Sequence, residues 1–173
     1  MFDPVGAGAT GYRTSTALTL MEGFPPSIIR ANASEVLAIA GSSRKTKGVD
    51  STHSSDAAID AARSLVQEFG SVVVISGETD FIVGKERTCQ VHNGCSLMSR
   101  VTGMGCTATA LSGAFAAVNS DYFTAATNSM ALMGICGEIA SKKAHGPGTF
   151  QSLFLDALYE ISPDDIESTI RVK

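Results

Sequence analysis

The segment Gly103-Met104-Gly105-Cys106 carries the clearest chemical signal in the chain, because its two glycines stand directly before a predicted helix at residues 107–118. Glycines at a helix start leave backbone N–H groups free to point at an anion, and the helix dipole adds about half a positive charge there. The four residues therefore predict an anion hole. A tight strand-to-helix turn explains the same glycines equally well.

Cys106 lies at the start of that helix, where a thiol could serve as a base or as a nucleophile. A small buried apolar residue is the structural alternative for a cysteine. A nucleophilic thiol would also permit a cysteine hydrolase that uses His92 or His145, but no spacing places either histidine beside Cys106. His53 is equally isolated, and the three histidines lack the spacing of metal ligands. We interpret all three as loop residues.

A second candidate site follows the predicted strand at residues 28–30. Arg30 at the strand end can bind phosphate oxygens with its guanidinium fork. Glu35 can help to place a hydrated Mg²⁺ on nucleotide phosphates, directly or through water, because this ion takes one or two carboxylates and keeps its waters. Structural alternatives are a surface ion pair for Arg30 and a capping box in which Asn32 and Glu35 start a helix.

Polar groups also follow two further predicted strand ends. Ser76-Gly77-Glu78 supplies a hydroxyl and a carboxylate, and Asp3 precedes a glycine-rich loop. Each is more often a turn residue than a ligand. Ligands of open α/β sheets bind at the carboxyl ends of strands, so the coincidence of these junctions predicts one phosphate-binding site.

The elements that must position these residues alternate along the chain. Helical spacing predicts helices at residues 12–21, 33–41, 54–70, 107–118, 121–144 and 150–161, with a short tail helix after Ser162-Pro163. Apolar runs predict strands at residues 28–30, 72–75, 81–83 and 88–92. The polar stretch at residues 42–51 predicts an exposed, mobile loop.

Strands that alternate with helices predict one domain over residues 1–173, a three-layer α/β/α fold with a mostly parallel central sheet and one antiparallel hairpin. Asn93-Gly94 is the strongest short hairpin signal in the chain. The first ten residues are typical of the end of a buried strand that runs into a glycine-rich loop. Because a domain seldom begins there, we expect further strands to precede them. The alternative is a domain that begins with a short edge strand.

Composition narrows the class of protein. The 173 residues are 44% apolar and 17% charged, which is the balance of a well-cored globular domain. A net charge of −4 argues against binding to nucleic acid or anionic lipid. The longest apolar stretch, at residues 130–139, is too short to span a membrane. Four cysteines without paired spacing predict free thiols and a cytoplasmic location.

Several segments, taken together and in order, resemble the hydroxyethylthiazole kinase family. They are Asp3-Pro4-Val5-Gly6-Ala7-Gly8-Ala9-Thr10, Ile29-Arg30-Ala31-Asn32-Ala33-Ser34-Glu35, Gly48-Val49-Asp50-Ser51, Ser76-Gly77-Glu78-Thr79-Asp80, Val101-Thr102-Gly103-Met104-Gly105-Cys106 and, near the C-terminus, Gly146-Pro147-Gly148-Thr149-Phe150. The resemblance implies a ribokinase-like fold, a homotrimer with shared substrate sites, and ATP- and Mg²⁺-dependent phosphorylation of 4-methyl-5-(2-hydroxyethyl)thiazole in thiamine biosynthesis.

The resemblance also implies roles for single residues. Arg30 and Ser76 match ATP-contacting positions, and Asp3 matches an acidic residue at the nucleotide-phosphate end of the site. Gly103 matches a position that contacts the thiazole substrate. Glu35 corresponds to the acidic member of a magnesium-linked motif, and Cys106 to a position that related sugar kinases fill with an aspartate base.

Small departures are Ala31, where the family commonly has glycine, and Ser76, where threonine is frequent. The resemblance further implies that the N-terminal third of a typical member, including a methionine-bearing loop over the thiazole, is absent. Two alternatives therefore stay open. One is an ATP-dependent NAD(P)H-hydrate dehydratase of the same fold, which residues 102–106 fit less well, and the other is a non-catalytic nucleotide-binding fragment.

Overall fold

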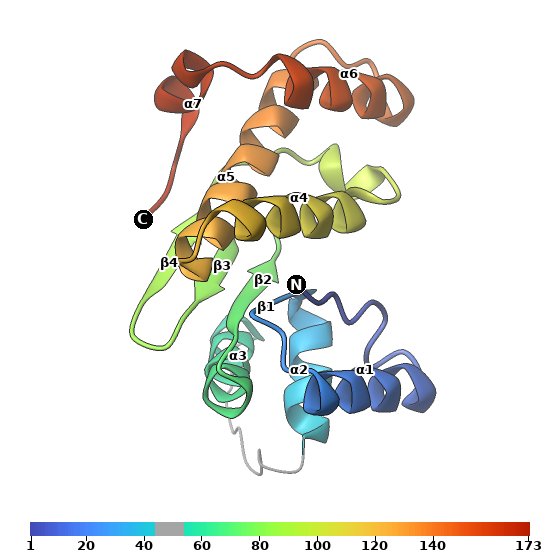
Figure 1. Ribbon diagram of the computed structural model, residues 1–173. Helices are drawn as coiled ribbons and strands as arrows, with labels where there is room; N and C mark the ends of the chain where they lie inside the picture. The colour runs from blue at the N-terminus through green and yellow to red at the C-terminus, as the bar shows by residue number, and fades with distance from the viewer. Residues whose placement is uncertain (44–53) are drawn as a thin grey trace.

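A computed structural model of the chain describes residues 1–43 and 54–173 (Figure 1). Most of the loop expected at residues 42–51 lies outside these ranges, as does the segment Gly48-Val49-Asp50-Ser51. None of the helices in the described ranges is long and apolar enough to cross a membrane.

Within the described residues the sheet has four strands in the order β1-β2-β3-β4. β1 is Ile28–Asn32, β2 is Val72–Ser76, β3 is Asp80–Val83 and β4 is Thr88–Val91. β1 and β2 are parallel, whereas β2–β3 and β3–β4 are antiparallel. The expectation of a mostly parallel sheet is therefore wrong for these strands. The connections after β2 and β3 are too short for the crossover that parallel pairing needs, so the chain reverses direction instead.

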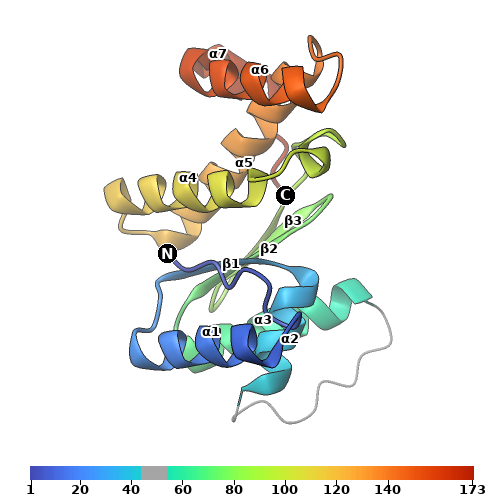
Figure 2. The ribbon, with the colours of Figure 1, turned by 90° about the vertical axis from the view of Figure 1, so that its right-hand side faces the viewer.

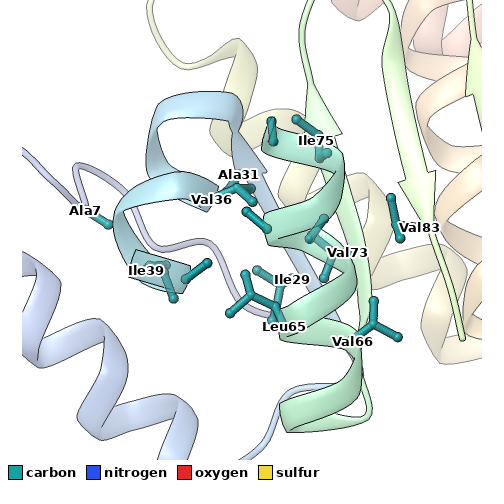
Figure 3. Close-up of a cluster of buried hydrophobic side chains, with 14 of the residues drawn as sticks. Ala7, Ile29, Ala31, Val36, Ile39, Leu65, Val66, Val73, Ile75 and Val83 are labelled. Atoms are coloured by element: carbon teal, nitrogen blue, oxygen red, sulfur yellow. The ribbon is translucent and has the colours of Figure 1, made fainter. Parts of the chain in front are cut away.

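Three helices cover one face of the sheet: α1 is Gly11–Gly23, α2 is Ala33–Ser42 and α3 is Ser54–Phe69 (Figure 2). Ile29 and Val73 project toward them, because alternate residues of a strand point to opposite faces. Figure 3 shows these strand residues packed against Ile39 of α2 and Leu65 of α3. All four side chains are fully buried.

The other face carries α4, Met104–Val118, α5, Tyr122–Ser141, and α6, Pro147–Glu160 (Figure 2). Ile28, Val74 and Ile82 belong to the core on this side. The buried hydroxyls of Ser112 and Ser129 lie 2.7 Å apart and link α4 to α5. A short α7, Pro163–Thr169, follows α6 as the tail helix expected from Ser162-Pro163.

Two expectations about local structure are wrong. Asn93-Gly94 does not form a hairpin, because the side chain of Asn93 is engaged with Glu138 and with residues near the C-terminus. The turn at Gly103 is not a strand-to-helix turn: in the described residues a 3₁₀ helix, Met98–Arg100, comes before it instead of a strand.

The C-terminal residues extend the sheet, which the sequence did not indicate. The backbone N–H of Gln90 donates to the carbonyl of Lys173 at 2.8 Å, and the reverse bond is 2.9 Å. Val172 forms an antiparallel bridge with Val91. Figure 1 shows the C-terminus beside β4.

The turn between β2 and β3 is held by Asp80, whose Oδ1 accepts the backbone N–H of Gly77 at 2.9 Å. Asp80 is only 8% exposed. Burial raises the pKa of its carboxyl from 3.8 to about 6, although the Gly77 hydrogen bond and the charge of Arg30 act in the opposite direction. A carboxyl at the start of β3 is thus more easily protonated in the folded than in the unfolded chain.

This difference predicts a pH-dependent stability that Asp80→Asn removes. Between pH 4 and pH 6 the folded state holds a proton that the unfolded state has lost, so the free energy of unfolding falls as pH rises. The total loss is about 3 kcal/mol by pH 7. The free energy of unfolding, measured by urea denaturation from pH 4 to 7.5, should fall for wild type relative to Asp80→Asn. The asparagine keeps an acceptor for the N–H of Gly77. Exposed Asp156→Asn is the control, and a constant difference between Asp80→Asn and wild type would refute the prediction.

Candidate functional site

Arg30 stands at the centre of the residues that the sequence singled out. Its side chain extends from β1, with Nη1 donating to Oδ2 of Asp3 at 3.1 Å and Nη2 donating to the hydroxyl of Ser76 at 2.8 Å. The side chains of Arg30 and Asp3 are only 12% and 11% exposed. The ion pair that was the structural alternative is therefore largely buried rather than on the surface. Arg30 joins β1 to the end of β2 and to the first residues of the chain.

The first turns of α4 complete this cluster. The hydroxyl of Thr109 donates to Oδ2 of Asp3, the same oxygen that Arg30 contacts. A Cβ placed on Gly105 would lie 3.0 Å from Nη1 of Arg30, so only a glycine lets the guanidinium approach the helix backbone this closely. The Nε atom of Arg30 is buried and has no hydrogen-bond partner among the described residues.

Gly103 gives α4 its anion-facing start. It is the N-cap, with φ of 94°, a left-handed conformation that glycine adopts without strain, and it offers no side chain as a cap. The first N–H groups of a helix have no partner within the helix. The start of α4 therefore leaves N–H groups available to an anion, as the anion-hole prediction requires, and Arg30 lies beside Gly105.

These elements border one cleft with a volume of about 1030 Å³. Arg30, Ser76 and Gly103 line it, together with Asp80 and the segment 92–96 after β4. Met130 and Met133 of α5 form part of the apolar wall. The cleft therefore combines a cationic, hydroxyl-bearing end with an apolar side, an arrangement that suits a ligand with both anionic and flat apolar parts.

Glu35 is a member of a capping box, the structural alternative for this residue. Its Oε2 accepts the backbone N–H of Asn32 at 3.0 Å, and its own N–H donates to Oδ1 of Asn32 at 2.9 Å. Oε1 accepts the backbone N–H of Gly6 at 2.8 Å, which fixes the glycine-rich loop after Asp3. Each carboxylate oxygen keeps a further lone pair. The residue therefore fits contact with the water shell of Mg²⁺ better than direct ligation.

No group of three His, Cys, Asp or Glu side chains that could hold a metal ion exists within residues 1–43 and 54–173. A Mg²⁺ ion that keeps several waters and is held mainly by substrate phosphates needs no such cage. The donor set here therefore fits Mg²⁺ only together with a phosphate ligand.

Cys106 is exposed in the first turn of α4, directly after the cleft residues 103–105. Its exposure excludes the small buried apolar role. Within the part of the chain that the structure describes, no hydrogen bond joins Cys106 to a histidine, so nothing supports the hydrolase. His92 lines the cleft, with its Nδ1 3.3 Å from the hydroxyl of Thr79.

Two site residues were missed by the sequence analysis. Thr109 lies four residues after Gly105 and so on the same helix face, a spacing that would have placed it near the anion hole. Asp80 was part of a recognised segment but received no role. Its hydrogen bond to the N–H three residues earlier is not one that the usual turn preferences indicate.

Comparison with known proteins gives the family of the chain. The sequence model described as the hydroxyethylthiazole kinase family matches residues 1–164. A hydroxyethylthiazole kinase of Syntrophus aciditrophicus is 54% identical over 173 residues, which is 99% of this chain and 64% of the relative. A hydroxyethylthiazole kinase of Leptospira biflexa is 51% identical over 100% of this chain and 65% of its own length.

A solved structure of a hydroxyethylthiazole kinase protein from Pyrococcus horikoshii has the same α/β fold, with a TM-score of 0.89 at 33% identity. The match covers 99% of this chain and 63% of that one. The chain thus spans just under two thirds of the length of these relatives. The family match over most of its residues, with identities near one half, shows that the chain belongs to the hydroxyethylthiazole kinase family.

Proposed function

We propose that this protein transfers the γ-phosphoryl group of ATP to the hydroxyl of 4-methyl-5-(2-hydroxyethyl)thiazole, a step in thiamine biosynthesis or salvage. The observation that carries the proposal is that Arg30, Ser76 and the start of α4 line one cleft, while Asp3 is bonded to both Arg30 and Thr109. Phosphoryl transfer needs mainly positioning and neutralisation of charge, and this cluster supplies both.

Arg30 and Ser76 contact ATP in this proposal. The guanidinium holds more donors than Asp3 and Ser76 occupy, so it can also bind phosphate oxygens. Asp3 fixes the orientation of Arg30, and Thr109 in turn fixes Asp3. The N–H groups at residues 103–106 stabilise negative charge on the transferred phosphoryl group.

Glu35 holds the water shell of Mg²⁺ in this proposal, and the ion neutralises charge on the phosphates when bound. The same carboxylate keeps the loop at Gly6 beside the phosphate end of the site. Gly103 contacts the thiazole. Cys106 takes the proton of the substrate hydroxyl or shapes the site around the phosphate.

The remaining parts of the proposal concern the whole protein. A ribokinase-like three-layer fold is supported by the helices on both faces of the sheet and by the similarity to the Pyrococcus protein. A homotrimer follows from the family resemblance, and a cytoplasmic location from the four cysteines without paired spacing.

An ADP-release assay with Mg²⁺, ATP and hydroxyethylthiazole tests the proposal, with hydrated NADH as the competing substrate. Turnover with the thiazole alone supports the kinase. Turnover with hydrated NADH would support the dehydratase, and nucleotide binding without turnover would support a non-catalytic protein.

Removing the guanidinium fork should impair ATP use. We expect Arg30→Lys to lower kcat/KM for ATP by about a hundredfold, because an ammonium cannot bridge Asp3, Ser76 and phosphate at once. Arg63→Ala, which breaks the exposed ion pair with Asp60, is the control and should stay within about twofold of wild type. Equal kinetics in both variants would remove Arg30 from the site.

Substitution of Cys106 distinguishes a proton acceptor from a residue that only shapes the site. If the thiol accepts the proton, Cys106→Ala should lower kcat by about a hundredfold and Cys106→Asp should restore most of it. Cys89→Ser is the control, since its thiol contacts Thr127 away from the cleft. Steady-state kinetics in which the Ala variant keeps full kcat would leave Cys106 with a role in shape only.

Glu35 has two proposed roles, capping α2 and binding the water shell of Mg²⁺, and Glu35→Gln tests the second. The matched control is Asp165→Asn, which disrupts the capping box of α7. Both variants should lose about 1 kcal/mol of stability, because each weakens a helix cap. Only Glu35→Gln should require a higher Mg²⁺ concentration for half-maximal activity. Magnesium titrations that overlay for wild type and Glu35→Gln would show that the residue is a cap alone.

A further inference from the structure

The wall of the cleft after β4 is fixed by groups that lie behind it. Asn93 is only 4% exposed, and its Oδ1 accepts the backbone N–H of Arg171 at 2.8 Å. Oε1 of Glu138, on α5, accepts the backbone N–H of Gly94 at 2.8 Å and Nδ2 of Asn93 at 3.1 Å. Nδ2 also donates to the carbonyl of Thr169 at 2.9 Å.

Arg171 joins these groups to the strand end. Nη1 donates to Oε2 of Glu138 at 3.1 Å, and Nη2 donates to Oε1 at 2.6 Å. Nη2 also donates to the carbonyl of His92 at 3.0 Å. Burial alone would raise the pKa of Glu138, but its hydrogen bonds to Arg171, Gly94 and Asn93 outweigh that effect and lower it. The carboxylate therefore remains an acceptor at neutral pH.

The backbone of α5 also lies close to Asn93. A Cβ on Gly134 would lie 2.4 Å from the carbonyl oxygen of Asn93, so no side chain fits between the helix and this segment. Residues 92–94 are thus held by α5 and by the C-terminal residues 169–171. Movement of the wall toward or away from the cleft requires one of these contacts to break.

We propose that Arg171, acting with Glu138, is a positioning residue for ATP: it holds residues 92–94 in the conformation that forms the wall of the nucleotide cleft. The identity of the ligand rests on the proposed function. His92, Asn93 and Gly94 line the cleft, whereas among the described lining residues neither Arg171 nor Glu138 occurs. The effect of Arg171 on ligand binding is therefore indirect.

ATP is the ligand affected because Arg30 and Ser76, which contact it in the proposed function, line the same cleft as residues 92–94. A volume of about 1030 Å³ is at the upper end of the range for ligand pockets and leaves room for a nucleotide as well as a thiazole ring. Loosening this wall should weaken nucleotide binding more than thiazole binding.

The test compares Arg171→Ala and Arg171→Lys with Arg87→Ala. Arg87 is a matched control, because its side chain is 54% exposed against 49% for Arg171 and it also pairs with a carboxylate, that of Asp121. Three quantities are measured: hydrogen exchange of the peptide covering residues 90–96, the Kd for ADP by calorimetry, and kcat with the KM for each substrate.

We expect Arg171→Ala to speed exchange at residues 92–94 and to raise the Kd for ADP and the KM for ATP by about tenfold, since misplaced binding groups lose affinity. The kcat and the KM for the thiazole should stay within about twofold of wild type, which a general loss of structure would not allow. Arg171→Lys should fall between wild type and Arg171→Ala, and Arg87→Ala should match wild type.

The experiment distinguishes failure of this inference from failure of the proposed function. A wild-type chain that binds ADP, with an Arg171→Ala variant that binds it equally well, would overturn this inference alone. A wild-type chain that binds no ADP would overturn the proposed function and this inference together. Unchanged exchange at residues 92–94 in Arg171→Ala would overturn the inference whatever the kinetics show.

Discussion

The buried charge of Arg30 is the constraint on which the site depends. A guanidinium removed from water destabilises the fold by several kcal/mol unless acidic or polar groups surround it. Asp3 and Ser76 meet this need, and Thr109 supports Asp3 in turn. Because these partners come from separate segments, satisfying one charge also sets the relative positions of β1, β2, the first residues and α4. Stability and the geometry of the phosphate end therefore have the same origin.

Local pattern was enough to predict the elements, because each depends on neighbours within a few residues. The runs at residues 72–75 and 81–83 are strands, and the expected helices are all present, with bounds shifted by a few residues. The pairing of strands depends on residues far apart in sequence, and the predictions of strand pairing were less accurate. The sheet is mixed rather than mostly parallel, and Asn93 is engaged with residues 169 and 171 instead of forming a hairpin.

For the site too, local features were predicted and contacts between distant segments were not. Arg30, Ser76 and Asp3 were each predicted from a strand end, and the structure brings them together. The sequence could not predict which of these groups bond to one another. It did not indicate that Asp3 pairs with Arg30, or that Glu35 accepts a hydrogen bond from Gly6 as well as capping its own helix. No sequence motif indicated Arg171 or Glu138, because their role depends on packing between α5 and the end of the chain.

The pairing of residues 171–173 with β4 also bears on behaviour at high concentration. An outer strand of a sheet presents a row of free N–H and C=O groups that can recruit a strand from another molecule. Here Arg171 and Lys173 bond to His92 and Gln90, so part of that row is already occupied from within the chain. Lys173 also places a cation at this border, and charged residues on an outer strand disfavour pairing with a second copy. The segment therefore shortens the part of the sheet edge that is free to pair with another molecule.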